Sequence, residues 1–530
     1  MDTETLRKKI LDLAIRGKLV PQDPNDEPAS VLLERIRAQK AQMVKDGKLK
    51  AKDVKNDTII YVGEDNLHYE KFADGTIKCI EDEIPFEVPE SWAWAHLSDI
   101  AQILNGDRGQ NYPAKNKLQD TGIPFVSASN IESGVVISNN LLCMTEAQYK
   151  SLGAGKLITN DIVYCIRGSL GKCGFFTMSK GAISSSLVIV RPFRENNVIR
   201  KYLFLYLNAS LAESEIKKYD NGSAQPNLAA KDFARFLIPV PPLDELDTIV
   251  KKTDNVLMLV EQITNNKESI KNIISLTTSK ILDLAIHGKL VPQNDNDEPA
   301  SMLLERIRAE KEELIKQGKI KRDKRESVIY RGTDNSYYER FADGSEKCID
   351  EEIPFEIPDS WTWVRLGHII KNIQYGLSSS AEISGTCHLL RITDIQNGKV
   401  DWDTVPYTST NNLDKYLLHI NDILFARTGA TVGKSFLVTQ LPCDSVYASY
   451  LIRVQLLDNI WIQYIHKFFN SNSYWAQIRD KMVGVGQPNC NGTSLKELLI
   501  PFPPHLEQKR ITLCMKDLIN KINSMIDYIS

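Results

Sequence analysis

The sequence lacks long apolar runs, paired cysteines and the histidine patterns of metal sites. No segment approaches the roughly 18 consecutive apolar residues that a membrane-spanning helix needs. The stretch from Met1 to Lys9 is polar and charged, with no apolar run behind it long enough for a secretory signal. The nine cysteines include no C-x-x-C pair, and the eight histidines form no H-x-H or H-E-x-x-H pattern. These absences predict a cytoplasmic protein with reduced cysteines, no bound metal and no membrane partner.

The motifs of common nucleotide-dependent and DNA-modifying enzymes are also missing. The stretch Thr428 to Ser435 resembles a P-loop, but it has three residues between its glycines where that motif has four. A DNA methyltransferase needs a glycine-rich S-adenosylmethionine site and an Asn/Asp-Pro-Pro-aromatic loop. The Pro-Pro pairs that begin at Pro241 and Pro503 lack both the amide or acid and the aromatic residue. The sequence also shows no acidic pair beside a lysine that stands out as a nuclease triad. The sequence therefore predicts a binding protein that is not an enzyme and holds no cofactor.

Charge is nearly balanced overall but uneven along the chain. The formal net charge is −3, which does not indicate a nucleic-acid binder. However, Arg37 to Lys55 carries seven basic and two acidic residues, and Arg308 to Arg325 carries eight and four. Such runs are usually solvated helix ends and loops. They also suit a flank that follows DNA phosphates and adds affinity without sequence information. The sequence leaves both interpretations open.

One long uninterrupted stretch lies in the middle of the chain. Between Leu243 and Pro292 there is no other proline, and there is no glycine before Gly288. Aliphatic residues recur at alternating steps of three and four, the spacing of a helix that packs lengthwise on another helix. About forty residues at roughly 1.5 Å each would make a rod of about 60 Å. Such a helix needs a long partner.

The chain is an internal duplication. Residues Lys9–Ala38 and Lys280–Ala309 match at 26 of 30 positions. Further matching pairs are Tyr69–Trp94 with Tyr338–Trp363, Asp161–Lys172 with Asp422–Lys434, Ala224–Asn227 with Gly486–Asn489, and Ile238–Pro242 with Ile500–Pro504. The stretches at roughly 96–160 and 365–421 show no comparable match. Segments that match between the halves, with unmatched stretches between them, predict one scaffold that carries two different recognition segments.

The two ends of the chain supply a partner for the central stretch. The C-terminus copies the first half of that stretch, and the N-terminus copies its second half. We therefore expect the end segments to pack antiparallel on the central helix in a circular, pseudo-two-fold arrangement. The expected fold is α+β, with two domains of mixed α/β structure separated by long antiparallel coiled-coil-like helices. The expected parts are an N-terminal helical segment (1–45), a first domain (46–240), a central helix and connector (241–315), a second domain (316–502) and a C-terminal helix (503–530).

Residues rich in hydrogen-bond donors and acceptors are the candidates for contact with DNA. We expect Arg167 and Arg427 at matching places of a strand–turn element, where arginine could contact guanine. The alternative is that they pair with Asp161 and Asp422 to fix the turn. Glutamine and asparagine near the turns can read adenine or merely stabilise the loop. The loops 105–117 and 374–381 differ between the halves, so they are the candidates for specificity. The full set is Arg108, Gln110, Asn111, Tyr112, Lys115, Arg167, Lys172, Gln225, Asn227, Gln374, Tyr375, Ser378, Arg427, Lys434, Gln487 and Asn489.

The order of these segments resembles that of the specificity (S) subunits of type I restriction–modification systems. The resemblance covers essentially the whole chain. It rests on IPFEVPESWAWAHL with IPFEIPDSWTWVRL, DILFARTGATVGK, the Gln-Pro-Asn loops, IPFPPHLEQKRI and LDLAIHGKLVPQNDNDEPASMLLERI. The first copy departs from the pattern at Leu246, where the second copy keeps the glutamine of Glu507-Gln508.

The resemblance implies that 46–240 and 316–502 are target recognition domains. Each would read half of a bipartite, asymmetric target in the major groove of double-stranded DNA. The paired helices would set the spacer and dock two methyltransferase (modification) subunits that carry S-adenosylmethionine. Through these they would hold two restriction subunits that use ATP, and this chain would supply no catalysis. The other hypotheses are a protein–protein scaffold without DNA specificity, and an orphan DNA methyltransferase or NTPase, against which the missing motifs argue.

Overall fold

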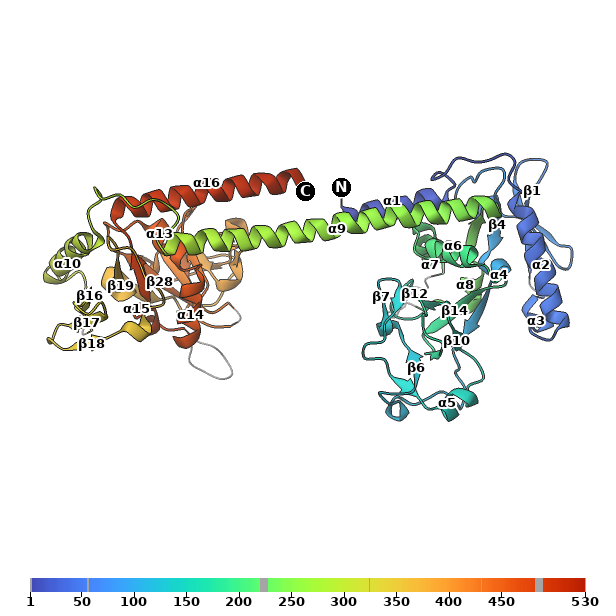
Figure 1. Cartoon of the computed structure of the whole chain (residues 1–530), viewed down its shortest axis with the longest axis horizontal. Helices are drawn as coiled ribbons and strands as arrows, with labels where there is room; N and C mark the ends of the chain where they lie inside the picture. The colour runs from blue at the N-terminus through green and yellow to red at the C-terminus, as the bar shows by residue number, and fades with distance from the viewer. Residues whose placement is uncertain are drawn as a thin grey trace. The chain divides into compact units, whose positions relative to one another are not determined.

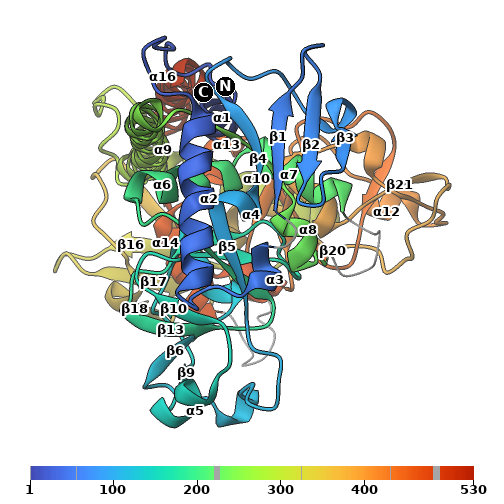
Figure 2. The ribbon, with the colours of Figure 1, turned by 90° about the vertical axis from the view of Figure 1, so that its right-hand side faces the viewer.

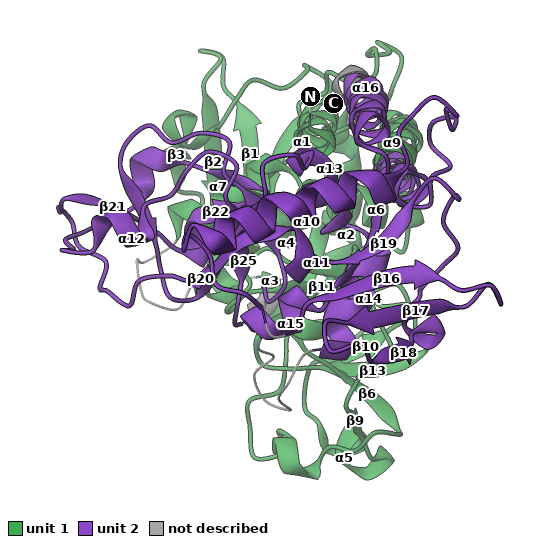
Figure 3. Ribbon diagram, turned by 90° about the vertical axis from the view of Figure 1, so that its left-hand side faces the viewer, with its two compact units in different colours: residues 1–267 green, residues 268–530 purple. Residues whose placement is uncertain are grey.

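The computed structural model describes residues 2–54, 57–219, 227–323, 325–429, 431–481 and 490–529. The chain divides into two compact units, residues 1–267 and 268–530, coloured green and purple in Figure 3. Each unit mixes helices with sheets around its own core, as expected for an α+β fold. In the described part of the chain, no helix combines the length and apolar character needed to cross a membrane.

Unit 1 consists of helices and short strands, labelled in Figure 1. The helices are α1 (Thr3–Ile15), α2 (Ala29–Lys45), α3 (Ala51–Val54), α4 (Leu97–Ile100), α5 (Glu146–Ser151), α6 (Asn197–Leu207), α7 (Ser210–Lys218), α8 (Ala230–Ala234) and the first part of α9 (Leu243–Ile286). The strands are β1 (Thr58–Val62), β2 (His68–Phe72), β3 (Ile77–Cys79), β4 (Ala93–His96), β5 (Ala101–Asn105), β6 (Ile123–Val126), β7 (Ile131–Glu132), β8 (Val135–Val136), β9 (Cys143–Met144), β10 (Lys156–Ile158), β11 (Ile162–Cys165), β12 (Cys173–Phe175), β13 (Lys180–Ile183), β14 (Leu187–Pro192) and β15 (Leu237–Val240).

The largest sheet of unit 1 has the order β5-β14-β11-β12-β8-β7 and separates two cores. Because side chains alternate along a strand, Ile162 and Tyr164 of β11 face one core while Val163 and Cys165 face the other. Burial on both faces explains why this strand is a continuous apolar run. The smaller sheets are β1-β2-β3, β10-β13-β6-β9 and β15-β4. Most pairings are antiparallel, and β12 with β8 and β13 with β6 are parallel.

Unit 2 repeats this plan with changed details. Its helices are the last part of α9, α10 (Ala300–Lys316), α11 (Leu366–Ile369), α12 (Leu413–Tyr416), α13 (Ile462–Phe468), α14 (Asn472–Lys481), α15 (Gly492–Lys496) and α16 (His505–Ile529). Its strands are β16 (Ser327–Arg331), β17 (Tyr337–Phe341), β18 (Glu346–Cys348), β19 (Thr362–Arg365), β20 (Ile370–Tyr375), β21 (Cys387–Leu390), β22 (Ile395–Gln396), β23 (Lys399–Val400), β24 (Tyr407–Thr408), β25 (Ile423–Ala426), β26 (Ser435–Leu437), β27 (Ser445–Tyr447), β28 (Leu451–Leu456) and β29 (Leu499–Phe502). The sheets have the orders β16-β17-β18, β19-β29, β20-β28-β25-β26, β24-β21-β27 and β22-β23.

The predicted central helix is α9, which has 44 residues. In unit 1 it lies antiparallel to α1 and the segment that follows α1 (Figure 1). The Nζ atom of Lys252 donates to the carbonyl of Leu19 at 2.8 Å. Farther along α9, the charge of Lys267 adds to the hydrogen bonds from backbone amides that lower the pKa of Asp2. The N-terminal segment therefore packs on α9, as predicted.

The C-terminal helix α16 packs on the other end of α9, within unit 2 (Figure 1). Ile281 and Ile286 of α9 belong to the same core as Ile511 and Met515 of α16. These side chains are at most 8% exposed. Burial of aliphatic side chains from both helices supplies the attraction that holds them together.

A buried tryptophan and glutamate, together with an exposed glutamine, tie α9 to the body of unit 1. Glu245 accepts hydrogen bonds from Trp92 Nε1 and from Gln22 Nε2, both at 2.8 Å. Burial raises the pKa of the Glu245 carboxyl, and the two hydrogen bonds partly offset that effect. Unit 2 contains the same arrangement in Trp361, Gln293 and Glu507. The repeated residues thus fix where each domain joins its helix.

A helix and a three-stranded sheet form a distinct part of each unit. Figure 2 shows α2 in the foreground with the β1-β2-β3 sheet to its right. In unit 1, Glu70 of this sheet contacts His96 Nε2 at 2.9 Å and accepts from Thr58 Oγ1 at 2.7 Å. In unit 2, the equivalent Glu339 is paired with Arg365 at 2.7 Å. The two halves therefore satisfy the same buried carboxylate with different cations.

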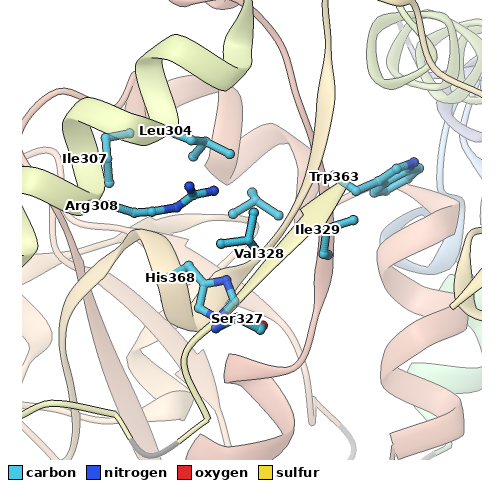
Figure 4. A pocket seen from close by; sticks show the side chains of 9 residues that line it. Leu304, Ile307, Arg308, Ser327, Val328, Ile329, Trp363 and His368 are labelled. Carbon is cyan, nitrogen blue, oxygen red and sulfur yellow. Dashed lines mark hydrogen bonds between the residues drawn. The ribbon is translucent and has the colours of Figure 1, made fainter. Parts of the chain in front are cut away.

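Side chains of α10 and β16 surround a small gap in unit 2, as Figure 4 shows. The gap has a volume of about 10 Å³ and is lined by Ile307 and Arg308 of α10, Val328 of β16, and His368. A single water needs roughly 10–15 Å³, so this gap cannot hold a nucleotide or a base. Burial and then the nearby charge of Lys311 lower the pKa of His368 to about 4. We therefore assign the gap to packing.

We expect unit 1 to lose stability as the pH rises past the pKa of His96. Burial lowers that pKa, but the hydrogen bond with Glu70 and the charge of Asp99 outweigh burial and raise it. A raised histidine pKa contributes stability that is complete below the unfolded value of about 6.5 and is lost above the folded value. In thermal unfolding, the advantage of wild type over His96→Gln should be largest near pH 6 and should shrink toward pH 9. An advantage that does not change with pH would contradict this. The control variant is His68→Gln, because the His68 side chain, 15% exposed, contacts a different carboxylate, that of Glu81.

Candidate nucleic-acid interface

The two candidate arginines do not occupy matching positions in the strand–turn elements that hold them. The backbone of Ile166 in unit 1 bonds to Ser186 and to Leu228, and Arg427 makes the two equivalent bonds in unit 2. Arg427 therefore occupies the position of Ile166, and Arg167 is one residue farther along. The prediction of matching places is wrong by one residue. Because successive residues of an extended chain face opposite sides, Ile166 is buried in the core while Arg167 is exposed.

The alternative role of the two arginines is also wrong. Asp161 is bound by Arg191 of β14, with contacts of 2.6 and 2.8 Å. Asp422 is paired with Arg453 of β28 at 3.5 Å. Both partners lie on the strand next to the one that each aspartate precedes, which the sequence alone does not reveal. Arg167 and Arg427 are therefore not the cations that fix these turns.

Three predicted residues of unit 1 meet around one cavity. Arg108, Arg167 and Asn227 line a space of about 400 Å³ together with Lys231. Arg167 and Asn227 form an isolated antiparallel bridge, which brings the turn after β11 beside the start of α8. The described lining residues include three cations and no acid. Such a cavity is suited to a phosphate or to the acceptor atoms of a base edge.

The loop 105–117 has its own internal supports. Asp107 accepts from two backbone amides at 2.7 Å each. The amide of Asn111 donates to the carbonyl of Ser151 at 2.8 Å, and Tyr112 packs edge-on against Phe125. Asn111 and Tyr112 thus hold the loop in place, whatever else they contact. The side chains that the loop leaves exposed include Arg108, Gln110 and Lys115.

A larger groove continues from this cavity along unit 1. It has a volume of about 1470 Å³ and shares Asn105 and Lys231 with the smaller cavity. Lys156 and Arg235 also line it, as do Leu49, which follows α2, and several acidic residues. The groove thus connects the predicted contact residues to the end of the basic run seen in the sequence.

Unit 2 presents a different arrangement. The guanidinium carbon of Arg427 lies 4.9 Å from the centre of the Tyr375 ring, a cation–π contact. Tyr375 is 41% exposed, and its hydroxyl accepts from the backbone amide of Gly492 at 2.9 Å. Tyr450, 60% exposed, lies beside the same turn because its carbonyl accepts from the Arg427 amide. An arginine held on an aromatic ring is oriented before any ligand arrives.

The remaining candidates of unit 2 differ in whether their side chains are engaged within the unit or exposed to solvent. The Gln374 amide is engaged inside the unit, since it accepts from Arg453 at 2.6 Å and donates to the Lys415 carbonyl at 3.1 Å. Ser378 and Lys434 are exposed, as is Lys172 in unit 1. Three candidates, Gln225, Gln487 and Asn489, lie outside the described residues.

Sequence reasoning missed Lys231, which the structure places in the smaller cavity. The available signal was its position four residues after Asn227, at the start of α8. Tyr450 was also missed, and no motif identifies it. Among the described residues, no group of three or more histidine, cysteine, aspartate or glutamate side chains could hold a metal ion.

Comparisons with known proteins relate the whole chain, rather than single contact residues, to one family. A family model, the type I restriction modification DNA specificity domain, matches residues 89–272 and 358–527. The EcoAI specificity subunit of Escherichia coli is 29% identical, with 98% of this chain and 89% of that protein covered. The EcoEI specificity subunit of Escherichia coli is 27% identical, with 97% and 88% covered. A solved chain from a study of type I system assembly and conformational transition has a TM-score of 0.51 at 16% identity, with 84% and 94% covered.

Proposed function

Because this chain belongs to the type I restriction–modification DNA specificity family, we propose that each of its units reads one half of a bipartite, asymmetric DNA target. The chain is a specificity subunit, and its task is recognition of the DNA target. The family model matches once in each half, so two recognition domains are present. The proposed domains are 46–240 and 316–502, flanked by the helical segments 1–45, 241–315 and 503–530.

The proposal rests on a contrast between the two units. They share the same supporting hydrogen bonds but differ in the residues that could contact DNA. The cluster of Trp92, Gln22 and Glu245 recurs in unit 2 with the same hydrogen bonds. In contrast, the residue that follows β11 in unit 1 is Ile166, whereas the residue that follows the equivalent strand β25 in unit 2 is Arg427. Identical supports with different contact residues suit two domains that read different base sequences.

We further propose that the helices set the spacer and dock the partners. The family associates with methyltransferase subunits, and two such subunits would bind here, carrying S-adenosylmethionine. Two restriction subunits that use ATP would join through them, while this chain remains cytoplasmic and non-catalytic. Exposed apolar side chains on α9, such as Met258 (55% exposed) and Leu259 (56% exposed), support a docking role. A coiled-coil-like pairing with pseudo-two-fold symmetry between the halves is part of the same proposal.

Arg427→Ala should relax recognition in the half-site read by unit 2 and leave the other half-site unaffected. One bidentate arginine–guanine contact contributes about 1–3 kcal/mol, so affinity for the preferred site should fall roughly 10- to 100-fold. Fluorescence anisotropy of the methyltransferase complex, on duplexes with single base changes, measures this. Arg427→Lys should not restore recognition, because lysine lacks the planar pair of donors.

The matched control is Lys434→Ala on the same turn. A phosphate contact carries no base information, so this change should weaken binding equally on all duplexes. If Arg427→Ala also weakened binding equally on all sequences, Arg427 would be a backbone contact and the assignment would fail. A complex without any preference among duplexes would overturn the proposed function itself.

A further inference from the structure

Three lysines recur at the same three places in both units. They are Lys45, Lys48 and Lys50 in unit 1, and Lys316, Lys319 and Lys321 in unit 2. Helices α2 and α10 end at the first lysine of each set, and the chain then turns at Gly47 and Gly318, whose φ angles are both 70°. All six lysines are exposed.

Several residues close to these lysines differ between the two units, although the lysines themselves are the same. Gln42 and Asp46 of unit 1 correspond to Glu313 and Gln317 of unit 2, so polar surface positions of this segment differ in charge. The helix macrodipole favours a cation in the last turn, which accounts for the first lysine of each set. It does not account for the two lysines that follow the helix end, because the effect falls off within one turn. Folding therefore does not explain why all three recur.

In each unit, a residue close to the lysine turn is near or in contact with a short helix, α8 in unit 1 and α15 in unit 2. In unit 1, Leu49 lines the large groove, together with Lys231 of α8. In unit 2, Asp323 binds Lys496 of α15 at 2.8 Å, only two residues after Lys321. Helices α8 and α15 each follow a Gln-Pro-Asn loop in the sequence. These contacts link the lysine turns to α8 and α15. Lys231 of α8 lines the smaller cavity of unit 1, and Gly492 of α15 donates to the Tyr375 hydroxyl in unit 2.

Two acids near the lysine turns have contacts of their own. Glu312 of α10 is held by the guanidinium of Arg322. Asp46 accepts from the amide of Gln42 at 2.7 Å, an interaction that does not neutralise its charge. Basic residues outnumber acidic ones in the segments 37–55 and 308–325 that hold the lysine turns, so the net charge of each segment is positive.

We propose that these two lysine sets bind the phosphates of duplex DNA outside the two recognised half-sites. The inference rests on the proposed function, because it places an additional, sequence-independent contact on either side of the specific ones. Phosphate contacts of this kind fix register and add affinity without changing which bases are preferred. The repeat of the lysines follows, since the DNA backbone is chemically the same beside each half-site even where the bases differ.

The test is K45Q/K48Q/K50Q, assembled with the methyltransferase partner, on two duplexes. One duplex ends at the recognised sequence, and the other extends about 15 base pairs beyond it on both sides. We expect the variant to bind the extended duplex roughly tenfold more weakly than wild type and the short duplex equally well. The slope of log K against log salt on the extended duplex should fall by about 1 for each lost contact. K316Q/K319Q/K321Q should behave in the same way.

Two controls separate contact from general charge and from folding. K8Q/K201Q/K251Q removes three cations of unit 1 that are paired with acids on helices, and should leave both affinities unchanged. K45R/K48R/K50R should restore the extended-duplex affinity. The proposal is overturned if the glutamine variant binds the extended duplex like wild type, loses affinity equally on both duplexes, or changes its preferred bases. A wild-type complex that prefers no duplex would instead overturn the proposed function.

Discussion

Alanine at Arg108, Gln110 and Lys115 together should abolish recognition of one half of the DNA target while the other half is still read. These exposed side chains belong to the loop 105–117, which has no match in unit 2. Contacts to base edges contribute about 1–3 kcal/mol each, so two lost base contacts correspond to roughly 100- to 10,000-fold in affinity. Mapping of methylated motifs in cells that carry this chain and its partner would show one half of the motif become degenerate.

The loop itself should survive this change because its supports are left in place. Asp107 still accepts from two backbone amides, and Tyr112 still packs against Phe125. The melting temperature should therefore stay close to that of wild type. The control Asn111→Ala removes a support and should lower stability instead, since Asn111 donates to the Ser151 carbonyl. If both halves of the motif changed, or neither did, the assignment of this loop to one domain would be wrong.

Arg365→Ala should strongly destabilise unit 2. Arg365 is 8% exposed and binds Glu339 at 2.7 Å, Glu352 at 2.8 Å and the carbonyl of Glu497 at 2.9 Å. Its loss leaves Glu339, which is 5% exposed, without its cation. Removing one partner of a buried ion pair costs about 3–5 kcal/mol because the remaining charge is buried and unpaired. Urea unfolding followed by hydrogen exchange in β16–β18 measures the loss and locates it.

Arg331 on the neighbouring strand provides the matched control. It is partly exposed, and its contacts with Glu356 and Asp359 are 3.6 and 3.8 Å long. Exposed pairs of this kind contribute about 0–1 kcal/mol, so Arg331→Ala should be nearly neutral. A loss below about 1 kcal/mol for Arg365→Ala would show that Glu339 finds another partner or takes up a proton.

Several elements could be predicted because their signal is local. The absence of proline and glycine, with aliphatic residues at helical spacing, predicted the helix that the structure shows as α9. Duplication placed a copy of each half of that helix at the chain ends, and hydrophobic matching then predicted that the ends would pack on it. The cysteines were expected to be unpaired, and the nine cysteines are free.

The sequence predicted which residues could contact DNA, but it did not predict which of them lie together. Arg108, Arg167 and Asn227 were all proposed from the sequence, but their meeting in one cavity depends on a bridge between residues 60 positions apart. The equivalence of Arg167 and Arg427 was assigned from residue type, and the backbone bonds place them one residue apart. The partner of Asp161 was sought within the turn, whereas the sheet supplies Arg191 from the adjacent strand.

The sequence by itself determined the duplicated frame, the central helix and the family, because repeats and helical periodicity are properties of the linear chain. Only the tertiary structure decided which side chains share a cavity, which carboxylates are already bound and which arginine rests on Tyr375. The physical reason is that strand register sets these neighbours. A shift of one residue turns a side chain from the core to the solvent, and register follows from pairing between distant segments.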